Sequence, residues 1–134
     1  MKITKMNEEI RDMFREQPVN VMVTLNEDGS PHIICTSGEK WIGDDEHIIF
    51  ARWQMNKTGE NISRDDSVYL FVFDAEETKS FQIHGRGKFV DGEKIKKEYN
   101  LDFPTGRYEE GLVVEISNIY YGQYGDRTNQ KFEG

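Results

Sequence analysis

Strand-forming segments follow one another closely along most of this chain, and their spacing limits the fold more than any other feature. Runs rich in Val, Ile, Phe and Tyr occupy residues 19–25, 32–37, 40–42, 47–53, 67–74, 79–90 and 112–121. The residues that separate the first two runs include Asp28 and Gly29, which tolerate the positive φ of a tight turn. The pattern predicts six or seven strands, mostly in antiparallel hairpins. Strands so numerous and so close favour a closed barrel, because closure removes exposed edges.

Short helices are expected between these strands. Near the start, Met6, Ile10, Met13 and Phe14 fall on one face of a helix that ends before Pro18. Residues 57–66 and 92–100 predict two more helical segments of one or two turns. The fold expected is therefore mainly β with short helices.

Two further features of the chain concern its long sixth strand and its end. Gly85 and Gly87 lie inside the sixth strand and indicate a bulge or a sharp bend. The 134 residues suit one domain, without repeats or linkers, over residues 1–134. The polar tail, residues 119–134, is expected to be mobile or to lie against a partner.

The charge and the cysteine count exclude several functions. A net charge of −8 leaves no broad basic face for nucleic acid, although one locally basic pocket can still bind a small anion. Cys35 is the only cysteine, so neither an internal disulfide nor a cysteine metal cluster is possible. The three histidines fall in three different strands without the close spacing of metal ligands, so no metal site is expected.

The sequence also bears on localisation. The first residues have no continuous apolar run of a signal peptide, and no apolar stretch approaches the roughly 20 residues that a membrane helix needs. A soluble, cytoplasmic protein without membrane partners is expected.

The segment "FARWQMNKTGENISRDD", residues 50–66, carries the candidate binding site. Asn56 is a plausible N-cap, and Lys57, Thr58 and Gly59 follow in the first turn of the predicted helix. The free N–H groups of a helix start attract a phosphate, to which a lysine adds a full charge and a threonine a hydroxyl donor. The same residues are also common at the start of an ordinary surface helix, and the glycine spacing of a P-loop is missing.

Four segments in order resemble the FMN-binding split-barrel superfamily that includes pyridoxamine 5′-phosphate oxidase. They are "VMVTLNEDGSPHIICTS", "IIFARWQMNKTGENISRDDSVYLFV", "SFQIHGRGKFV" and "LVVEISNI", within residues 15–119. The small bacterial FMN-binding proteins are the most similar, because they share the Met-x-Lys-Thr-x-x-Asn run. The resemblance implies a six- or seven-stranded antiparallel split β-barrel of the Greek-key type. It also implies a homodimer with FMN in a groove between the subunits.

The resemblance assigns cofactor-binding roles by position. Lys57 and Thr58 would hold the FMN phosphate, while Asn61 would line the same groove. The ends of the second and fourth strands would run beside the flavin ring: Cys35, Thr36 and Ser37, and then Ala51, Arg52, Trp53 and Gln54. An aromatic residue of the second subunit would cover the ring, with Tyr108, Tyr120 and Tyr121 as candidates.

The function expected is redox chemistry through FMN, with a nicotinamide cofactor or another redox protein as partner. No residue is an obvious catalytic acid or base, so whether the protein is an enzyme stays open. The tail has one arginine and no histidine, unlike the segment that holds the substrate phosphate in pyridoxamine 5′-phosphate oxidase, so that reaction is not expected. The alternatives are a flavin-binding or electron-carrier module without its own substrate turnover, and a haem-binding split barrel.

Overall fold

The computed structural model describes residues 5–36, 39–122 and 131–132. Over these residues the chain is mainly β, with three short helices, α1 (Glu8–Glu16), α2 (Asn56–Arg64) and α3 (Gly92–Tyr99). The strands are β1 (Asn20–Leu25), β2 (Pro31–Thr36), β3 (Lys40–Asp44), β4 (His47–Ala51), β5 (Ser67–Asp74), β6 (Lys79–Asp91), β7 (Glu110–Tyr121) and the two-residue β8 (Lys131–Phe132). Six or seven strands and two or three short helices were expected from the sequence, and β8 is an addition.

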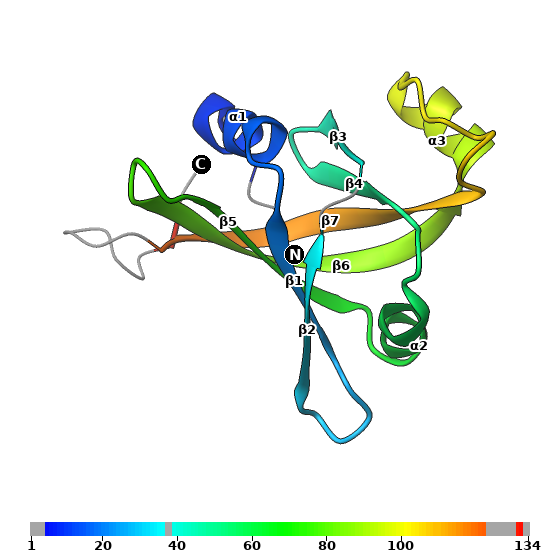
Figure 1. Ribbon diagram of the computed structural model, residues 1–134, viewed down its shortest axis with the longest axis horizontal. Helices are drawn as coiled ribbons and strands as arrows, with labels where there is room; N and C mark the ends of the chain where they lie inside the picture. Colours follow the sequence, from blue (N-terminus) through cyan, green and yellow to red (C-terminus); the bar gives the residue numbers. More distant parts are fainter. Residues whose placement is uncertain (1–4, 37–38, 123–130, 133–134) are drawn as a thin grey trace.

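All strand pairs are antiparallel, in the order β2-β1-β5-β6-β7-β4-β3, with β8 paired to β7. This order leaves β2 and β3 at the two ends of one strongly twisted sheet (Figure 1). Among the described residues no ladder joins the two ends. One side chain reaches from β3 toward the other end of the sheet: the Lys40 ammonium donates to the Gln17 carbonyl and to Asn20 Oδ1 at the start of β1, the strand next to β2. The sheet therefore closes on itself while keeping an open seam.

The inner face of the curled sheet and α1 share one hydrophobic core. Met22, Leu70, Ile83 and Ile116 come from four different strands and are almost fully buried. Asn7 caps α1 by accepting a hydrogen bond from the Ile10 N–H at 2.9 Å, as residues that begin a helix commonly do. The helix then buries Ile10, Met13 and Phe14, which confirms the amphipathic face expected from the sequence.

A smaller apolar cluster lies on the other side of the sheet, under α3. Ile95 of α3 and Phe103 of the following loop pack with Ile49 and Val113. This cluster fixes the α3–β7 loop, which reaches one edge of the candidate site. In the described part of the chain, no helix combines the length and the apolar character required to cross a membrane.

The bulge expected in the long strand is present. The register between β6 and β7 shifts between His84 and Gly85. A Cβ at Gly85 would lie 2.5 Å from the Glu115 carbonyl oxygen, so only glycine fits this close approach of two backbones.

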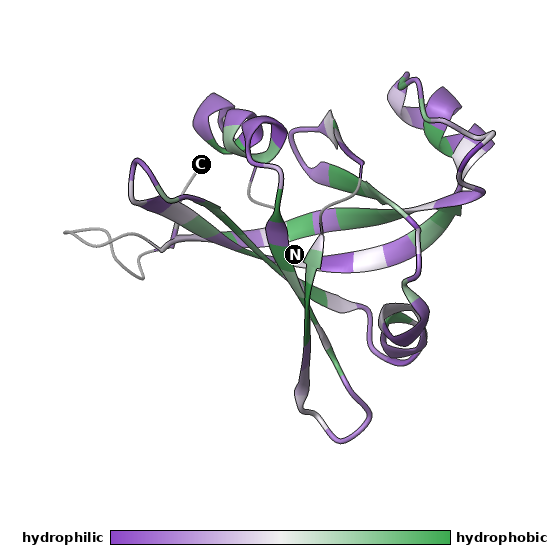
Figure 2. Cartoon of the chain, in the orientation of Figure 1, coloured by the Kyte–Doolittle hydropathy of each residue, from purple (hydrophilic) through white to green (hydrophobic). Residues whose placement is uncertain are grey.

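Strand β1 directs its branched apolar residues away from the core. Asn20, Met22 and Thr24 are the buried members of its alternation, whereas Val21 and Val23 are only half-buried. Figure 2 shows hydrophobic residues along β1 and β2, although this hairpin projects from the body of the molecule. Its outward face is thus more apolar than a surface requires.

Candidate functional site

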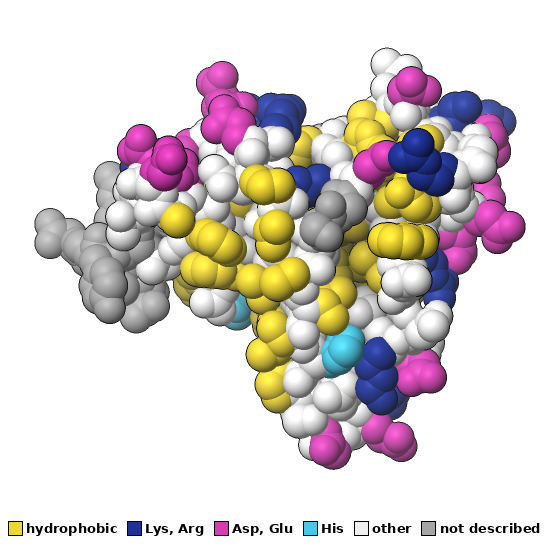
Figure 3. Space-filling model, in the orientation of Figure 1, with side chains coloured by type: hydrophobic (Ala, Val, Ile, Leu, Met, Phe, Trp, Pro, Cys, Tyr) yellow, Lys and Arg dark blue, Asp and Glu magenta, His cyan; other side chains and the backbone are white. Residues whose placement is uncertain are grey.

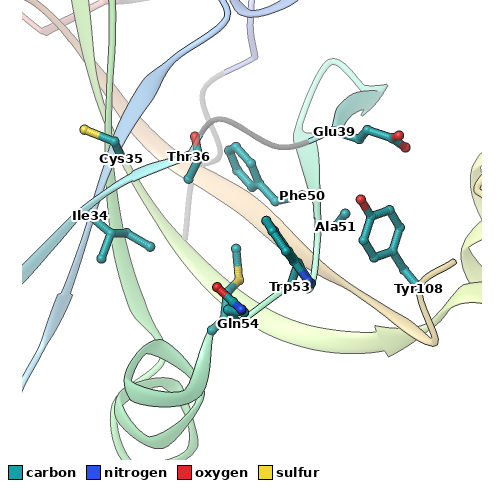
Figure 4. Close-up of a pocket in the computed structure, with 10 residues that line it drawn as sticks. Ile34, Cys35, Thr36, Glu39, Phe50, Ala51, Trp53, Gln54 and Tyr108 are labelled. Carbon is teal, nitrogen blue, oxygen red and sulfur yellow. The ribbon is translucent and has the colours of Figure 1, made fainter.

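A cavity of about 300 Å³ opens at the seam between β2 and β4 (Figure 4). Its walls come from the end of β2, the segment before β3, the end of β4 and the α3–β7 loop. They are Ile34, Cys35, Thr36, Glu39, Phe50, Ala51, Trp53, Gln54, Met55 and Tyr108. Strand ends meet here because β2 and β3 do not pair, so the seam itself makes the cavity.

Backbone donors at the end of β4 are already in use. The N–H of Ala51 donates to the Glu39 carbonyl at 3.0 Å, and the N–H of Arg52 donates to the Glu110 carbonyl at 3.1 Å. On the facing strand, the Thr36 hydroxyl donates to the Asn20 carbonyl at 3.2 Å. These two N–H groups at the end of β4 are therefore not free to bind a ligand in the cavity.

That segment has an unusual backbone and an exposed aromatic side chain. Gln54 has a φ of 54°, in the left-handed region that residues other than glycine adopt at a cost of about 1–2 kcal/mol. Trp53, directly before it, is 67% exposed, and Figure 4 shows its indole ring among the side chains that line the cavity. Leaving so large an apolar side chain in water is unfavourable unless a ligand or a partner covers it.

The N-terminus of α2 meets the edge of the cavity. The helix begins at Asn56, and its N-cap is Met55, whose side chain makes no capping hydrogen bond. The expectation that Asn56 is the N-cap was wrong by one position, because Asn56 already has helical geometry. Asn7 and Asp91 do cap α1 and α3. The first N–H groups of α2 therefore keep their partial positive charge without a side-chain acceptor.

Two cations lie at this helix start. Lys57 has a side chain that is 52% exposed and only a distant ion pair, 3.8 Å from Glu60. Arg52 is held more firmly: it contacts the Glu110 carboxylate at 2.9 Å and lies 3.9 Å above the Phe89 ring. A Cβ on Gly59 would come within 2.9 Å of the Arg52 guanidinium, so the glycine lets the first turn of α2 lie against this arginine.

The structure brings together only part of the site that the sequence predicts. Cys35, Thr36, Ala51, Trp53 and Gln54 all line the seam cavity. Ser37 lies outside the described residues. Arg52, Lys57, Thr58 and Asn61 do not line the cavity, although the first three surround the start of α2.

Thr58 and Asn61 are buried beneath α2. Thr58 is 2% exposed and Asn61 is fully buried. The Asn61 amide donates to Thr24 Oγ1 and to Asn26 Oδ1, both at 3.1 Å. Asn61 thus fastens α2 to β1 and the turn that follows it, and whether it also reaches a ligand stays a prediction.

The sequence did not predict several of the residues that line the cavity. Ile34, Glu39 and Phe50 had no sequence signal, since they reach the cavity only because the two ends of the sheet face each other. Met55 lies in the Met-x-Lys-Thr-x-x-Asn run, so the sequence could have identified it. Tyr108 was one of three candidates to cover the ring from a second subunit, and it lines the cavity of its own chain. In the described residues no group of three or more acidic, histidine or cysteine side chains has metal-binding geometry.

A second cavity, of about 460 Å³, lies beside the first. Both are lined by Trp53, Gln54, Met55 and Tyr108, so these residues form a partition between them. Arg52 and Arg107 line the second cavity from its other side, each with a carboxylate partner, Glu110 and Glu39. The candidate site therefore continues beyond the seam cavity into a second hollow.

Comparison with known proteins agrees with this geometry. Residues 6–115 match a family model described as pyridoxamine 5′-phosphate oxidase. None of the curated proteins matches the chain in sequence. Among solved structures, HupZ from Group A Streptococcus superimposes with a TM-score of 0.75 at 18% identity, over 92% of this chain and 98% of that one.

Two further structures share the fold. A protein of Lactobacillus delbrueckii, named in its structure as a candidate pyridoxamine 5′-phosphate oxidase, gives a TM-score of 0.71 at 18% identity, over 87% of this chain and 93% of that one. An FMN-binding protein from Syntrophomonas wolfei gives 0.61 at 19% identity, over 88% and 86%. At such identities these neighbours establish the fold alone. The family match spans most of the residues, and with the split sheet it shows that the chain belongs to the pyridoxamine 5′-phosphate oxidase family.

Proposed function

We propose that this protein binds FMN at the seam and serves as a flavin-dependent redox protein. The observation that carries the proposal is the cavity at the split of the sheet, which leads to a helix N-terminus without a side-chain cap. Its volume of about 300 Å³ is at the lower end of the range for small-molecule sites, as suits a groove that a second subunit completes. The FMN-binding protein of similar fold supports the choice of cofactor.

The start of α2 is the proposed phosphate site. A phosphate there would accept hydrogen bonds from the uncapped N–H groups, as anions at helix starts do. Lys57 is exposed and weakly paired, so it can turn its ammonium toward the phosphate without giving up a strong contact. Thr58 would add its hydroxyl from beneath the first turn, and the guanidinium of Arg52 adds positive potential from the side.

The seam cavity is the proposed site of the flavin ring. Thr36 and Ala51 form its buried walls, while Cys35 and Gln54 border its opening. FMN, once bound, supplies the transfer of a hydride or of single electrons, and the protein holds and orients it. Trp53 and Tyr108 would border the ring and limit its contact with water.

The neighbouring cavity favours an enzyme over a simple electron carrier. Its partition with the seam cavity consists of Trp53, Gln54, Met55 and Tyr108, so a molecule in it would lie beside the flavin. A nicotinamide cofactor or another small redox partner would fit this arrangement. Oxidation of pyridoxamine phosphate is not proposed, because the chain has no histidine after His84 and one arginine in its tail. The proposed assembly is a homodimer.

The test compares FMN with riboflavin, which lacks the phosphate. In equilibrium titrations followed by flavin fluorescence, Lys57→Ala with Thr58→Ala is expected to weaken FMN binding about 100-fold or more, because a charge-assisted contact and a hydroxyl contact are lost. Riboflavin binding is expected to change little. Lys94→Ala, on α3, is the matched control and should leave both affinities unchanged.

Three outcomes would contradict the proposal. Equal losses for both ligands would show that the pair supports the fold rather than the phosphate. A protein that takes up neither flavin would remove the proposed cofactor altogether. A preparation with a Soret band in place of the flavin bands would support a haem-binding barrel instead.

A further inference from the structure

The outward face of the sheet carries a row of mostly uncharged side chains across five strands. The register pairs Ile33 with Val23, Val23 with Tyr69, Tyr69 with His84, and His84 with Asn118. Side chains at paired positions project from the same face of a sheet, so these five are neighbours. The row begins on the end strand β2, where Ile33 is 63% exposed.

A parallel row lies two residues further along each strand. It consists of Cys35, Val21, Phe71, Gln82 and Tyr120, again on β2, β1, β5, β6 and β7. We call the two rows together the outer patch. Although 31% of the chain is Asp, Glu, Lys or Arg, neither row contains one of them. Figure 3 shows the same feature as a run of hydrophobic side chains over β1, β2 and β5.

The outer patch contains a projection and a hollow that fit each other. The hollow has a volume of about 290 Å³ and is lined by Val23, Tyr69, Leu70, Phe71 and Gln82. Ile33 projects directly beside it, since Val23 is both its cross-strand partner and a wall of the hollow. A two-fold rotation would place each Ile33 in the hollow of the other copy, which is the self-complementarity that a symmetric dimer requires.

We propose that a second copy of this chain packs on the outer patch, with the two Ile33 side chains in reciprocal hollows, and that packing requires neutral His84. The proposal rests on the homodimer of the proposed function and adds which face it uses and how pH controls it.

Charge and position both favour a second copy as the occupant. Each copy has a net charge of −8, so two copies can associate closely only over a face without acidic side chains, and the outer patch is such a face. A charged partner, by contrast, would meet no opposite charge on it. The outer patch is also continuous with the seam, because Cys35 belongs to the patch and lines the cavity. A copy packed here therefore comes to lie beside the flavin site.

His84 lies among side chains that favour its neutral form. The ring of Tyr69 on β5 meets the imidazole edge-on, with 4.8 Å between the ring centroids. The centroid of the Tyr120 ring on β7 lies 5.0 Å from that of the imidazole. On its own strand, the Gln82 amide nitrogen lies 2.9 Å from His84 Nε2, so the amide donates to the imidazole when that nitrogen is unprotonated. Burial lowers the pKa of His84 below 6.5.

Charged groups nearby do not reverse this preference. The nearest along β6 is Arg86, a cation, which lies 3.7 Å from Asp66 on its other side. From β7 the cross-strand partner is Asn118, which is neutral. Carboxylates, which would stabilise an imidazolium, are not among the groups that face His84 in the described residues.

The sign of the pH effect follows from this environment. A second copy would bury His84 further and lower its pKa again, so the charged form binds its partner more weakly. Because the pKa of His84 lies below 6.5, association is already at full strength at pH 6.5 and weakens only as the pH falls through that lowered pKa. Because a dimer holds two copies of His84, the association constant falls by up to about 100-fold per pH unit.

Sedimentation equilibrium of the whole chain, at about pH 8 and about pH 5.5, tests the proposal on either side of the histidine range. The wild-type association constant should be smaller at the lower pH. His84→Phe and His84→Gln should both remove the pH dependence, whereas His32→Asn, the control, should keep it. Ile33→Asp should weaken association about 30-fold or more at both pH values. Ala75→Asp adds the same charge in the β5–β6 turn and should change nothing.

Each contrary result has its own meaning. A dimer with the same affinity at both pH values would refute the role of His84, and one that tolerates Ile33→Asp would refute the outer patch. A monomer at every pH that still binds FMN would overturn the inference while leaving the cofactor in place. A pH-sensitive dimer that binds no flavin would support the inference and defeat the proposed function.

Discussion

At the scale of single residues, Asn61 shows how one buried amide can hold a helix on a sheet. Its amide nitrogen donates to Thr24 and Asn26, and its oxygen accepts from Arg64 at 3.1 Å. Arg64 in turn donates to the Leu25 carbonyl at 2.7 Å. The side chain is fully buried, so each of these contacts replaces one that water would have made.

Asn61→Ala is expected to destabilise the protein by about 1–3 kcal/mol, because the substitution leaves the Thr24 hydroxyl and its neighbours buried without their partner. Urea unfolding measures this change. Ser63→Ala, on the exposed side of the same helix, should cost less than about 0.5 kcal/mol. If Asn61→Ala kept full stability but lost FMN, the residue would be a ligand contact, as the resemblance implies, rather than an anchor.

The residues of the site could be predicted only where the chain itself carried the signal. The resemblance placed the ends of the second and fourth strands, with Cys35, Thr36 and Ala51, beside a flavin ring, and these residues line one cavity. The direction of Arg52 could not be predicted, because it is set by Glu110, a residue 58 positions away. The hydrogen bond from Lys40 to Asn20 could not be predicted for the same reason, since it joins two strands that form no ladder in the described residues.

At the scale of the elements, hydrophobic pattern gave the strands but not the face that each one buries. The alternation in residues 19–25 predicts a strand, and β1 is there. Its branched residues Val21 and Val23 face outward, however, and the buried positions include Asn20 and Thr24. A single strand of this pattern is compatible with either orientation. The choice here follows from neighbouring strands and from the outer patch, which sequence periodicity alone does not reveal.

The bulge between β6 and β7 is the element-scale feature with the strictest residue requirement. Gly85→Ala is expected to destabilise the protein by about 1–3 kcal/mol, because the new methyl group would meet the Glu115 carbonyl, which as backbone cannot move aside. Thermal or urea unfolding measures the loss. At Gly106 no heavy atom lies within 4 Å of an added Cβ, so Gly106→Ala serves as the control and should stay within about 0.5 kcal/mol of wild type. Equal stability of the two variants would show that the bulge relaxes freely.

At the scale of the whole molecule, the open seam and the outer patch lie on the same strand. Residues of β2 alternate between them: Ile33 belongs to the patch, Ile34 and Thr36 line the cavity, and Cys35 contributes to both. A strand that packs against a second copy is held in place, and so is the cavity wall that it forms. Flavin binding and self-association should therefore stabilise each other.

This coupling gives a prediction with two independent readouts. Saturating FMN is expected to strengthen dimerisation about 10-fold or more in sedimentation equilibrium at about pH 8, where His84 is neutral. Because a dimer holds two FMN molecules, thermodynamic linkage then requires that Ile33→Asp, which separates the copies, weaken FMN binding at each site by the square root of that factor, about 3-fold or more, although Ile33 does not line the cavity. Lys57→Ala with Thr58→Ala supplies the converse control. Without bound FMN this double variant should dimerise like wild type. At FMN concentrations that saturate the wild type, its dimerisation should strengthen little. A monomer that binds FMN as tightly as the dimer would separate the two properties and show that each copy holds its flavin alone.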